Sequence, residues 1–470
     1  MSLFRMFGDK PVDPQDAAAR FIEDSKHEEA HDRLVWAMRT NRDKAVAALP
    51  DWEDLRSVAS QIKEHTLTHL DTYLEHFEAA ATANGVHVHW ARDGAEHNAI
   101  VVQIFEERGV KLAIKSKSML QEECGMSESL TKHGIEARES DLGERIQQLS
   151  HERPSHIVVP SIHQLRTDVA ELFAKHLGTD PNNSDPHYLA ESMRNDARPQ
   201  FLRAQAGMTG ANFAIAETGA IVVCTNEGNA DIGATVPPLQ VCSIGIEKLI
   251  PRQIDLAVML RMLSRSALGP PMTQYTTHLR KPRPGAELHF ILVDNKRSER
   301  LGSKEFWHVL KCIRCGACMN TCPVYRRSGG LAYGGTYSGP IGIVLDPAFD
   351  PHKYHELPFH SSLCGSCSEV CPVKIDIADQ IYKWRREIVS QGELPAVEQA
   401  GIGVLGEVLA HPGLFEATET VGLRTLKLLP NAVLANRLNP WTNGRKMPVP
   451  AQTTFRQWFE DNRRRDGEDA

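Results

Sequence analysis

Seven cysteines in two short runs are the residues whose types and spacing point most directly to chemistry. The first run reads Cys312-Ile-Arg-Cys315-Gly-Ala-Cys318-Met-Asn-Thr-Cys322-Pro323, and the second reads Cys364-Gly-Ser-Cys367-Ser-Glu-Val-Cys371-Pro372. A single C-x2-C pair is compatible with a zinc knuckle or a redox dithiol. The C-x2-C-x2-C-x3-C-P spacing of the first run, followed by a second run that also ends in Cys-Pro, is instead typical of iron–sulfur ligation in two-cluster ferredoxins.

The same spacing predicts how the thiolates divide between two 4Fe-4S clusters. In such runs three cysteines bind one cluster, and the fourth, held in a stiff Cys-Pro turn, ligates the other. We therefore expect the first cluster to be bound by Cys312, Cys315, Cys318 and Cys371. The second cluster is expected to be bound by Cys322, Cys364 and Cys367, which leaves it one cysteine short.

Ser361 occupies the position in the second run that corresponds to Cys312 in the first. A serine hydroxyl is a poorer ligand than a thiolate for this soft site. The second site could therefore hold a 4Fe-4S cluster completed by Ser361 or an outside ligand, a 3Fe-4S cluster, or a labile cluster. Alternatively, Ser361 only caps the turn into Cys364. We expect a 4Fe-4S cluster with one weakly held iron.

The composition is that of an ordinary globular protein. The 470 residues suffice for two to four domains, and a net charge of −7 argues against a nucleic-acid protein with a broad basic face. Cys124, Cys224 and Cys242 are expected to be buried core thiols, and free thiols beside oxygen-sensitive clusters suit a cytoplasmic location. The sequence shows neither a secretory signal nor an apolar run long enough to span a bilayer. Any contact with the inner membrane is thus expected to be peripheral, through partners.

Residues 1–84 are expected to form an N-terminal helical region that packs on the next domain. Asp51 is placed to cap a helix that begins at Trp52, since acidic residues follow it in the first turn. His65 and His69 stand four residues apart, but no glutamate completes a metal-binding H-E-x-x-H pattern. We therefore interpret this histidine-rich face as solvated surface.

Residues 85–296 show alternating strand and helix patterns, which predict a largely parallel sheet covered on both faces. The expected strands include 86–90, 110–115, 134–138, 156–160, 239–246 and 289–293. The stretch 178–198 is polar and is assigned to no strand or helix, and the glycines at 207 and 210 are interpreted as a tight turn. The absence of a Walker loop and of a G-x-G-x-x-G fingerprint argues against ATP and NAD as ligands.

The cluster domain is expected to span residues 297–395, and a C-terminal region residues 396–470. Asp376 is expected to cap a helix that ends near Gly392. The Gly/Pro-rich segment 333–342 is expected to bring backbone close to a cluster or a partner. The tail is expected to be helical and then proline-rich, with Trp441 and Trp458 as docking residues.

Nearly the whole chain resembles the lactate-utilisation protein B family of iron–sulfur proteins. The resemblance rests on both cysteine runs and on the segments Lys115–Ser118, Glu139–Glu144, Pro154–Pro160, Ala216–Gly219, Gly339–Gly342 and Asn439–Arg445. The missing cysteine at position 361 also matches the family. The resemblance implies an α/β lactate-utilisation (LUD) domain with a CoA-transferase-like parallel sheet, an alpha-helical two-cluster ferredoxin domain, and helical termini.

The resemblance also implies a function in the oxidation of L-lactate to pyruvate beside two other lactate-utilisation subunits. The expected role is electron transfer through the two clusters to an acceptor such as a quinone, with the substrate chemistry on a partner or at a shared interface. In an alternative of a different class, the α/β domain is itself an enzyme, with Glu217 as a carboxylate nucleophile like that of CoA transferases. The third alternative is a cluster protein with a purely structural function.

Overall fold

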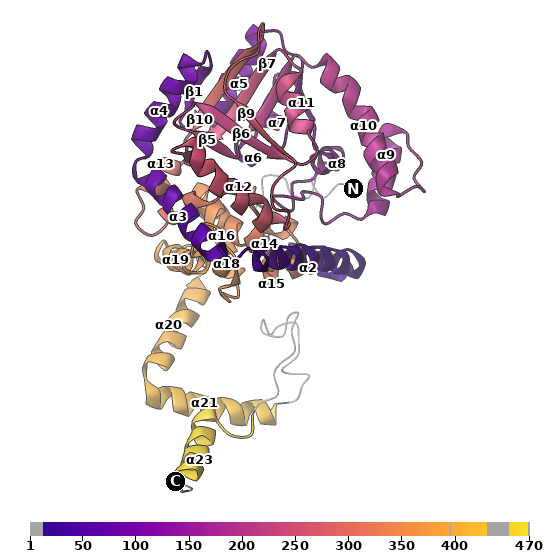
Figure 1. Ribbon diagram of the computed structural model, residues 1–470. Coiled ribbons are helices and arrows are strands. Elements are labelled where there is room, and N and C mark those ends of the chain that lie inside the picture. The colour runs from indigo at the N-terminus through magenta and orange to yellow at the C-terminus, as the bar shows by residue number, and fades with distance from the viewer. Residues whose placement is uncertain (1–12, 395, 430–450, 469–470) are drawn as a thin grey trace. The chain divides into compact units, whose positions relative to one another are not determined.

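The computed structural model describes residues 13–394, 396–429 and 451–468. The chain divides into one compact unit up to Ile388 and a second unit from Val389 onward. The first unit contains the α/β part, the N-terminal helices and the two cysteine runs (Figure 1). Whether this unit should be divided further at residues 84 and 296 stays a prediction.

A six-stranded sheet forms the centre of the first unit, and all its neighbouring strands are parallel. Its strands, in spatial order, are β1 (His87–Ala91), β10 (Glu287–Val293), β7 (Leu239–Gly245), β4 (Ala206–Gly210), β2 (Leu112–Lys115) and β3 (Glu136–Glu139). A parallel sheet needs crossover connections, and the helices that make them cover both of its faces. The expected α/β class is confirmed.

Two apolar cores hold these helices against the sheet. The first core packs Phe105 and Met126 against Val241 and Ile291, and the second packs Phe173 and Phe201 around Ile114. Complete burial of one such side chain contributes ~1.5–3 kcal/mol. The first face is covered by α5 (Gly94–Glu107), α6 (Met119–Glu123) and α7 (Met126–Lys132). The second is covered by α8 (Leu142–Ser150), α9 (Arg166–Leu177), α10 (Pro186–Arg203) and α11 (Asn229–Thr235).

A smaller four-stranded sheet lies beside the first. Its order is β8 (Leu249–Ile250), β5 (Phe213–Ile215), β6 (Ala220–Thr225) and β9 (Tyr275–Leu279), and α12 (Gln253–Ala267) contacts β5 and β8. Gly219 closes the turn between β5 and β6 with φ +64°, and an added Cβ would lie 2.3 Å from the backbone nitrogen of Ala81. Only glycine combines this conformation with so close an approach to α4 (Leu70–Ala83).

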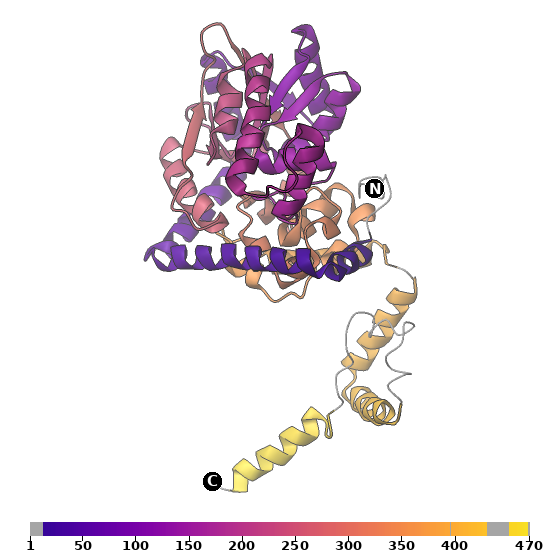
Figure 2. The ribbon, with the colours of Figure 1, turned by 90° about the vertical axis from the view of Figure 1, so that its right-hand side faces the viewer.

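The N-terminal residues of the first unit form four helices, as expected. They are α1 (Pro14–Glu23), α2 (Ser25–Ala47), α3 (Trp52–Thr68) and α4 (Leu70–Ala83), and Figure 2 shows α2 along the helices of the cysteine segment. The helix predicted to begin at Trp52 does so, but the Asp51 side chain makes no capping hydrogen bond and lies 3.3 Å from Arg261 instead. His65 pairs with the Tyr73 hydroxyl at 2.9 Å on an exposed face.

Two local predictions for the α/β part were wrong, and one helix was not predicted. Residues 156–160 form a loop, because the backbone N–H groups of Val158 and Val159 donate to His156 Nδ1 and not to a neighbouring strand. The polar stretch 178–198 contains most of α10, whose first turn is capped by the Asp185 side chain. The residues around Gly207 form strand β4, where an added Cβ would lie 2.0 Å from the carbonyl oxygen of Gly233.

Short helices surround the two cysteine runs. They are α13 (Arg297–Leu301), η3 (Trp307–Lys311), α14 (Ala317–Thr321), α15 (Pro323–Ser328), η4 (Leu331–Tyr333), α16 (Gly339–Phe349), α17 (Pro351–Tyr354), η5 (Leu357–Phe359), α18 (Ser366–Glu369) and α19 (Ile377–Ser390). Asp376 Oδ1 accepts from the backbone N–H of Asp379 at 3.1 Å, which agrees with its predicted capping role. In the Gly/Pro-rich segment, an added Cβ on Gly339 would lie 2.8 Å from Met319 Cγ, so this backbone packs directly against α14.

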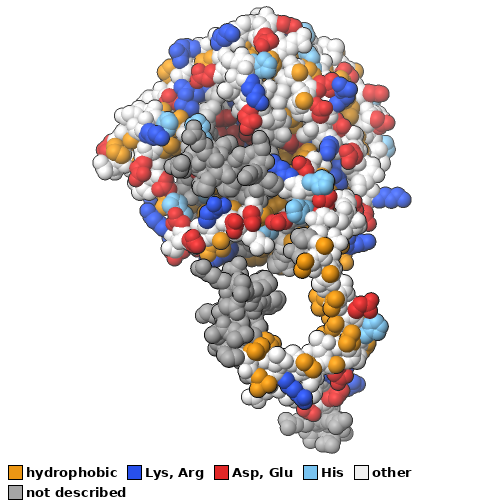
Figure 3. Space-filling model, turned by 180° about the vertical axis from the view of Figure 1, so that it is seen from behind, with side chains coloured by type: hydrophobic (Ala, Val, Ile, Leu, Met, Phe, Trp, Pro, Cys, Tyr) orange, Lys and Arg blue, Asp and Glu red, His pale blue; other side chains and the backbone are white. Residues whose placement is uncertain are grey.

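The second unit contains α20 (Ala396–Ala410), α21 (Pro412–Leu428) and α23 (Phe455–Glu468). Many of its hydrophobic side chains are exposed, as Figure 3 shows, and they include Val404 and Leu409 on α20. Of the two expected docking residues, Trp458 is about half exposed, and Trp441 lies outside the described residues. A search of the described residues found no helix with the length and apolar character needed to cross a membrane.

Candidate iron–sulfur site

Short turns and helices position the cysteines of the first run. Helix η3 ends immediately before Cys312, α14 carries Cys318, and the Cys322 sulfur accepts from the backbone N–H of Tyr325 at the start of α15. Proline at position 323 is compatible with the first turn of α15, because the first N–H groups of a helix have no partner within it. The backbone therefore turns sharply at each cysteine and presents several thiols within a few residues.

The second run repeats the local conformation of the first. Residues 314 and 316 have φ values of +60° and +77°, and the corresponding residues 363 and 365 have φ values of +54° and +80°. In the first run the N–H of Arg314 donates to Cys312 Sγ at 3.4 Å, and in the second the N–H of Leu363 donates to Ser361 Oγ at 3.1 Å. The Ser361 hydroxyl thus occupies the place in its loop that the Cys312 sulfur occupies in the other loop.

Four thiols are close enough to influence one another electrostatically. Burial raises the pKa of Cys315, and the neighbouring thiols Cys371 and Cys312 raise it further. Burial also raises the pKa of Cys318, followed by the effects of Cys315 and Cys312 and then of Cys367 and Cys371. Cys371 comes from the second run, so the fold brings it beside three cysteines of the first.

The other three cysteines form a second group. Burial raises the pKa of Cys367 to about 12, with further contributions from Cys322 and then Cys364. The pKa of Cys322 is also raised, by burial and by Cys364. Cys364 is exposed, whereas Cys322 and Cys367 are buried. Cys367 also raises the pKa of Cys318, so these two thiols, one from each group, lie near each other.

Two arginines from the N-terminal helices hold the backbone of the second run. Arg56 on α3 donates from Nε and Nη2 to the carbonyl oxygen of Cys371 at 3.0 and 2.9 Å, and from Nη2 to that of Glu369 at 2.6 Å. Arg42 on α2 donates to the carbonyl oxygen of Val370 at 3.3 Å. The carbonyl of Cys371 also accepts from the backbone N–H of Lys374 at 3.2 Å, but these carbonyls lie at or just beyond the end of the short helix α18, where no further helical turn follows to satisfy them. The guanidinium groups take that role.

A third arginine connects the two runs. Arg39 Nη1 donates to Thr321 Oγ1 in the first run and lies 3.5 Å from Ser366 Oγ in the second. The two hydroxyl groups also pair with each other. Sequence analysis missed these three arginines, because their contacts join residues about 280–330 positions apart and leave no local pattern.

Charged groups from α3, the α/β part and the first run itself lie around Cys312. Arg314 lies over the Tyr337 ring at 4.6 Å and 3.7 Å from Glu247. Burial lowers the pKa of Lys63 to about 7, and the charges of Glu247 and Cys312 act to raise it. Glu247 is buried too, which acts to raise its pKa, but Arg297, Lys248 and Arg314 together lower the pKa of this carboxyl to about 2. The first run is thus enclosed by paired charges at the carboxyl ends of the central strands.

The loop around His156 contacts the first cysteine run from another side. His156 Nε2 lies 2.9 Å from Asn320 Oδ1, and an added Cβ on Gly316 would lie 3.3 Å from the side chains of His156 and Val158. The hydroxyl of Tyr325 donates to the carbonyl oxygen of Ser155 at 2.8 Å. The α/β part therefore contributes directly to the packing around the thiols.

Comparison with known proteins agrees with these features. Three family models match: the LUD domain over residues 74–303, the 4Fe-4S dicluster domain over 308–375, and the C-terminal domain of lactate utilisation protein B over 385–464. Lactate utilization protein B of Bacillus cereus (strain B4264) is 38% identical over 454 residues, which cover 94% of this chain and 96% of the relative. The protein of the same name from Bacillus thuringiensis (strain Al Hakam) is 37% identical with the same coverage.

The chain belongs to the lactate utilization protein B family. It is an iron–sulfur protein of that family, since the 4Fe-4S dicluster domain covers both cysteine runs. A crystal structure of a duf162 family protein from Deinococcus radiodurans covers 48% of this chain and 98% of its own, at 13% identity. Its TM-score of 0.27 is too low to argue a common architecture.

Another motif of the lactate utilization protein B resemblance forms a buried ion cluster. Lys115 Nζ lies 2.7 Å from Glu122, 2.8 Å from Glu139 and 3.9 Å from Glu144. Burial raises the pKa of Glu144, and the charge of Glu139 raises it further, so one carboxyl of this group retains its proton most strongly. The cluster joins the carboxyl ends of β2 and β3 to α6 and α8.

Glu217, the candidate nucleophile, has a structural partner. Its side chain is exposed, and Oε2 accepts from the backbone N–H of Gln253 at 2.8 Å, at the start of α12. A carboxylate at this position stabilises a helix N-terminus. The contact supports the capping alternative for this residue.

The residues at the cysteine runs fit iron–sulfur clusters. Thiols of both runs lie near one another, and backbone N–H groups donate to three of them, Cys312, Cys322 and Cys371, at 3.3–3.4 Å. Donors of this kind stabilise sulfur ligands and tune the reduction potential of a cluster. Burial raises the pKa of the enclosed thiols, so iron must displace their protons when the clusters are assembled.

Proposed function

We propose that this protein is the iron–sulfur electron-transfer subunit of an L-lactate oxidation system, and that it acts with two other lactate-utilisation subunits. The observation that carries the proposal is the arrangement of the thiols in one group of four and one group of three, connected through Cys318 and Cys367. When bound there, 4Fe-4S clusters supply one-electron transfer. Two clusters bound by these thiols would be neighbours, and the exposed Cys364 supports an approach of the acceptor at the second one.

The proposal includes a cytoplasmic location, and a quinone as the class of acceptor, reached through the partners. To test the function, the complex of the three subunits is purified without oxygen and L-lactate is added while the EPR signal of the reduced clusters is recorded. We expect a signal with L-lactate and none with D-lactate. Cys318→Ala should abolish this signal, whereas the matched variant Cys224→Ala, which changes a thiol outside both groups, should retain it. Clusters that stay oxidised in the complete wild-type complex would refute the role.

We further propose that Cys371 completes the first cluster although it belongs to the second run. The support is its electrostatic contact with Cys312 and Cys315. Cys371→Ser should change the Mössbauer and EPR signals of the four-cysteine cluster, and Cys364→Ser those of the other cluster. If both substitutions altered the same cluster, the assignment would be wrong.

For the second cluster we propose a 4Fe-4S form with one weakly held iron, with Ser361 as a turn cap and not as a ligand. The support is the hydrogen bond that its hydroxyl accepts from Leu363. Ser361→Ala should leave the spectra and the iron content unchanged. Ser361→Cys should make this cluster more resistant to oxygen, because the backbone already matches that at Cys312. Loss of iron from Ser361→Ala would show that the hydroxyl is a ligand.

We propose a structural role for Glu217, and its capping bond to Gln253 is the support. Glu217→Gln retains a hydrogen-bond acceptor but removes the nucleophile. Incubation with acyl-CoA substrates followed by mass spectrometry should detect no adduct on the wild-type protein. A covalent adduct that the Gln variant lacks would establish the catalytic alternative.

A further inference from the structure

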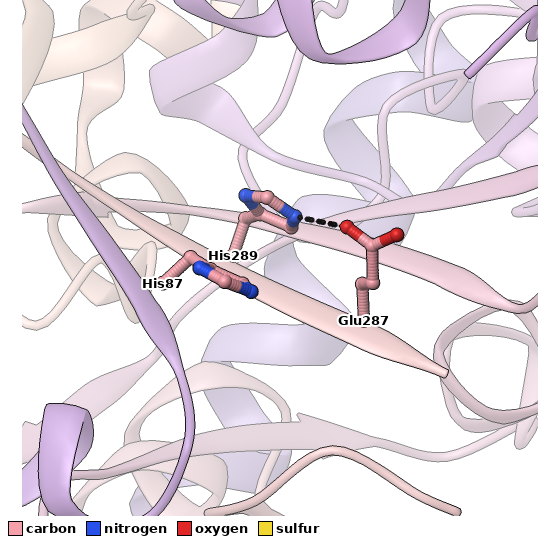
Figure 4. A group of neighbouring side chains, drawn as sticks. All are labelled: His87, Glu287 and His289. Carbon is pink, nitrogen blue, oxygen red and sulfur yellow. Dashed lines mark hydrogen bonds and ion pairs between the residues drawn. The ribbon is translucent and has the colours of Figure 1, made fainter. Parts of the chain in front are cut away.

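Three histidines and a glutamate gather where β1 and β10 begin. His87 and Glu287 are the first residues of their strands, and His87 is the register partner of His289. Alternate residues of a strand face the same side, so His89 joins them on the face that α5 covers. Figure 4 shows the His87 and His289 rings side by side, with the Glu287 carboxylate opposite a ring nitrogen of His289.

The donor atoms of this group are close enough to share one ion. The His87 and His289 rings stack with centroids 4.7 Å apart and an interplanar angle of 24°. His289 Nε2 lies 3.2 Å from Glu287 Oε2. One donor atom from each of these three residues lies within 4.8 Å of the other two. Small rotations of the exposed His87 side chain would bring all three within metal-ligand distance of one point.

His89 is placed to orient His289. The second nitrogen of His289, Nδ1, lies 3.0 Å from His89 Nε2. Histidines that bind metals generally donate their other ring N–H to such a partner, which fixes the tautomer. If Nδ1–H of His289 donates to His89, then His289 Nε2 carries a lone pair that faces the Glu287 carboxylate, and a cation between them would stabilise this arrangement; in the other tautomer Nε2–H donates to Glu287 directly.

The α/β part has another group of converging carboxylates, but that group already contains its own cation. Glu122, Glu139 and Glu144 also converge, but Lys115 already provides their cation from inside the cluster. At the histidine group, Arg108 contacts Glu287 at 2.7 Å on Oε2 and also pairs with Glu107 at 3.2 Å. A bound ion would therefore compete with Arg108 for one carboxylate oxygen and not for the imidazoles.

We propose that His87, Glu287 and His289 form a Zn²⁺ site, with His89 as the residue that orients His289. Two imidazoles and one carboxylate, with an open position for water, are a ligand set typical of zinc. Imidazole ligands favour Zn²⁺ over Mg²⁺ or Ca²⁺. The site lies at the amino ends of the strands, whereas the thiols lie near the carboxyl ends, so it is separate from the clusters. Its effect would be to fasten the edge strand β1 to β10.

The test uses the full-length, cluster-loaded protein, purified without oxygen and dialysed against ZnCl₂. We expect one zinc per chain, and X-ray absorption at the zinc edge should show N and O ligands at about 2.0–2.1 Å without a sulfur shell at about 2.3 Å. The sulfur shell is decisive, because zinc in an empty cysteine site would display it. His87→Ala should weaken zinc binding by about 100-fold or more, and His89→Ala by about 10–100-fold, the range measured for orienting residues.

His87 is exposed, so its substitution should leave the fold intact, and the iron content and cluster EPR of His87→Ala should equal those of the wild type. The matched control is His69→Ala, which removes an exposed histidine whose ring lies 4.5 Å from that of His65. It should bind zinc like the wild type. Equal zinc affinity in His87→Ala and the wild type, or zinc bound through sulfur alone, would overturn the proposal.

Discussion

Replacing Arg56 should shorten the lifetime of the clusters, because this side chain satisfies two carbonyl oxygens beside Cys371. It donates three hydrogen bonds of 2.6–3.0 Å to the oxygens of Glu369 and Cys371, and it is 9% exposed. Hydrogen bonds to charged groups are worth ~1.5–3 kcal/mol each. Because the Cys371 carbonyl keeps the backbone N–H of Lys374 as a partner, losing the contacts to the two carbonyl groups should cost about 3 kcal/mol, the low end of their sum. The Glu53 partner adds little, since its side chain is mostly exposed.

Cluster proteins often unfold irreversibly, so the suitable measure is a half-life. Each 1.36 kcal/mol in a barrier changes a rate about tenfold, and a loss of 3 kcal/mol would shorten the half-life by at most roughly 150-fold. We therefore expect the iron–sulfur absorbance of Arg56→Met to decay about 10–100-fold faster than that of the wild type at a fixed elevated temperature, without oxygen.

Two further variants separate the contributions to this effect. Arg56→Lys keeps the charge but not the planar fork that reaches both carbonyls, so its half-life should fall between those of the wild type and Arg56→Met. Arg33→Met, which removes an exposed arginine of α2, should decay like the wild type. If Arg56→Met decayed no faster than Arg33→Met, the guanidinium would not be what holds the second run in place.

Three other substitutions test the surrounding fold. Lys115→Met should destabilise the protein by about 3–5 kcal/mol, because it leaves buried carboxylates unpaired. The loss should appear as faster thermal inactivation, and Lys132→Met, which changes an exposed lysine, should have no effect. Gly219→Ala should cost more than about 2 kcal/mol through backbone strain and the clash with α4, and more than Gly109→Ala, where an added Cβ meets nothing within 4 Å. Burial lowers the pKa of His31 to about 4, so between about pH 6.5 and 4 the unfolded chain binds a proton that the folded chain does not. Stability should therefore fall by roughly 1–3 kcal/mol as the pH drops through this window, and His31→Gln should lack that part of the pH dependence in denaturation curves.

The local conformation of the cysteine runs could be predicted because it follows from the spacing of the cysteines. Counting back from Cys371 identified Ser361 as the counterpart of Cys312, and the two loops share backbone angles and an equivalent hydrogen bond. The parallel sheet was also predictable, since its strands alternate with helices along the chain. The loop at 156–160 was mistaken for a strand because its apolar residues resemble one, whereas its N–H groups are satisfied by the His156 side chain.

The sequence did not reveal that the backbone of the second cysteine run depends on hydrogen bonds from the N-terminal helices. A run of closely spaced cysteines forces short helices such as α18, and a short helix ends before its last carbonyl groups find partners within it. Proline after Cys371 prevents the chain from continuing that helix. Arg42 and Arg56 supply the missing donors from α2 and α3, and Arg39 joins the hydroxyls of both runs. The short helices that bring the thiols together therefore leave backbone carbonyl groups that need hydrogen-bond donors. In the described residues, these arginines of the N-terminal helices donate to them at the second run.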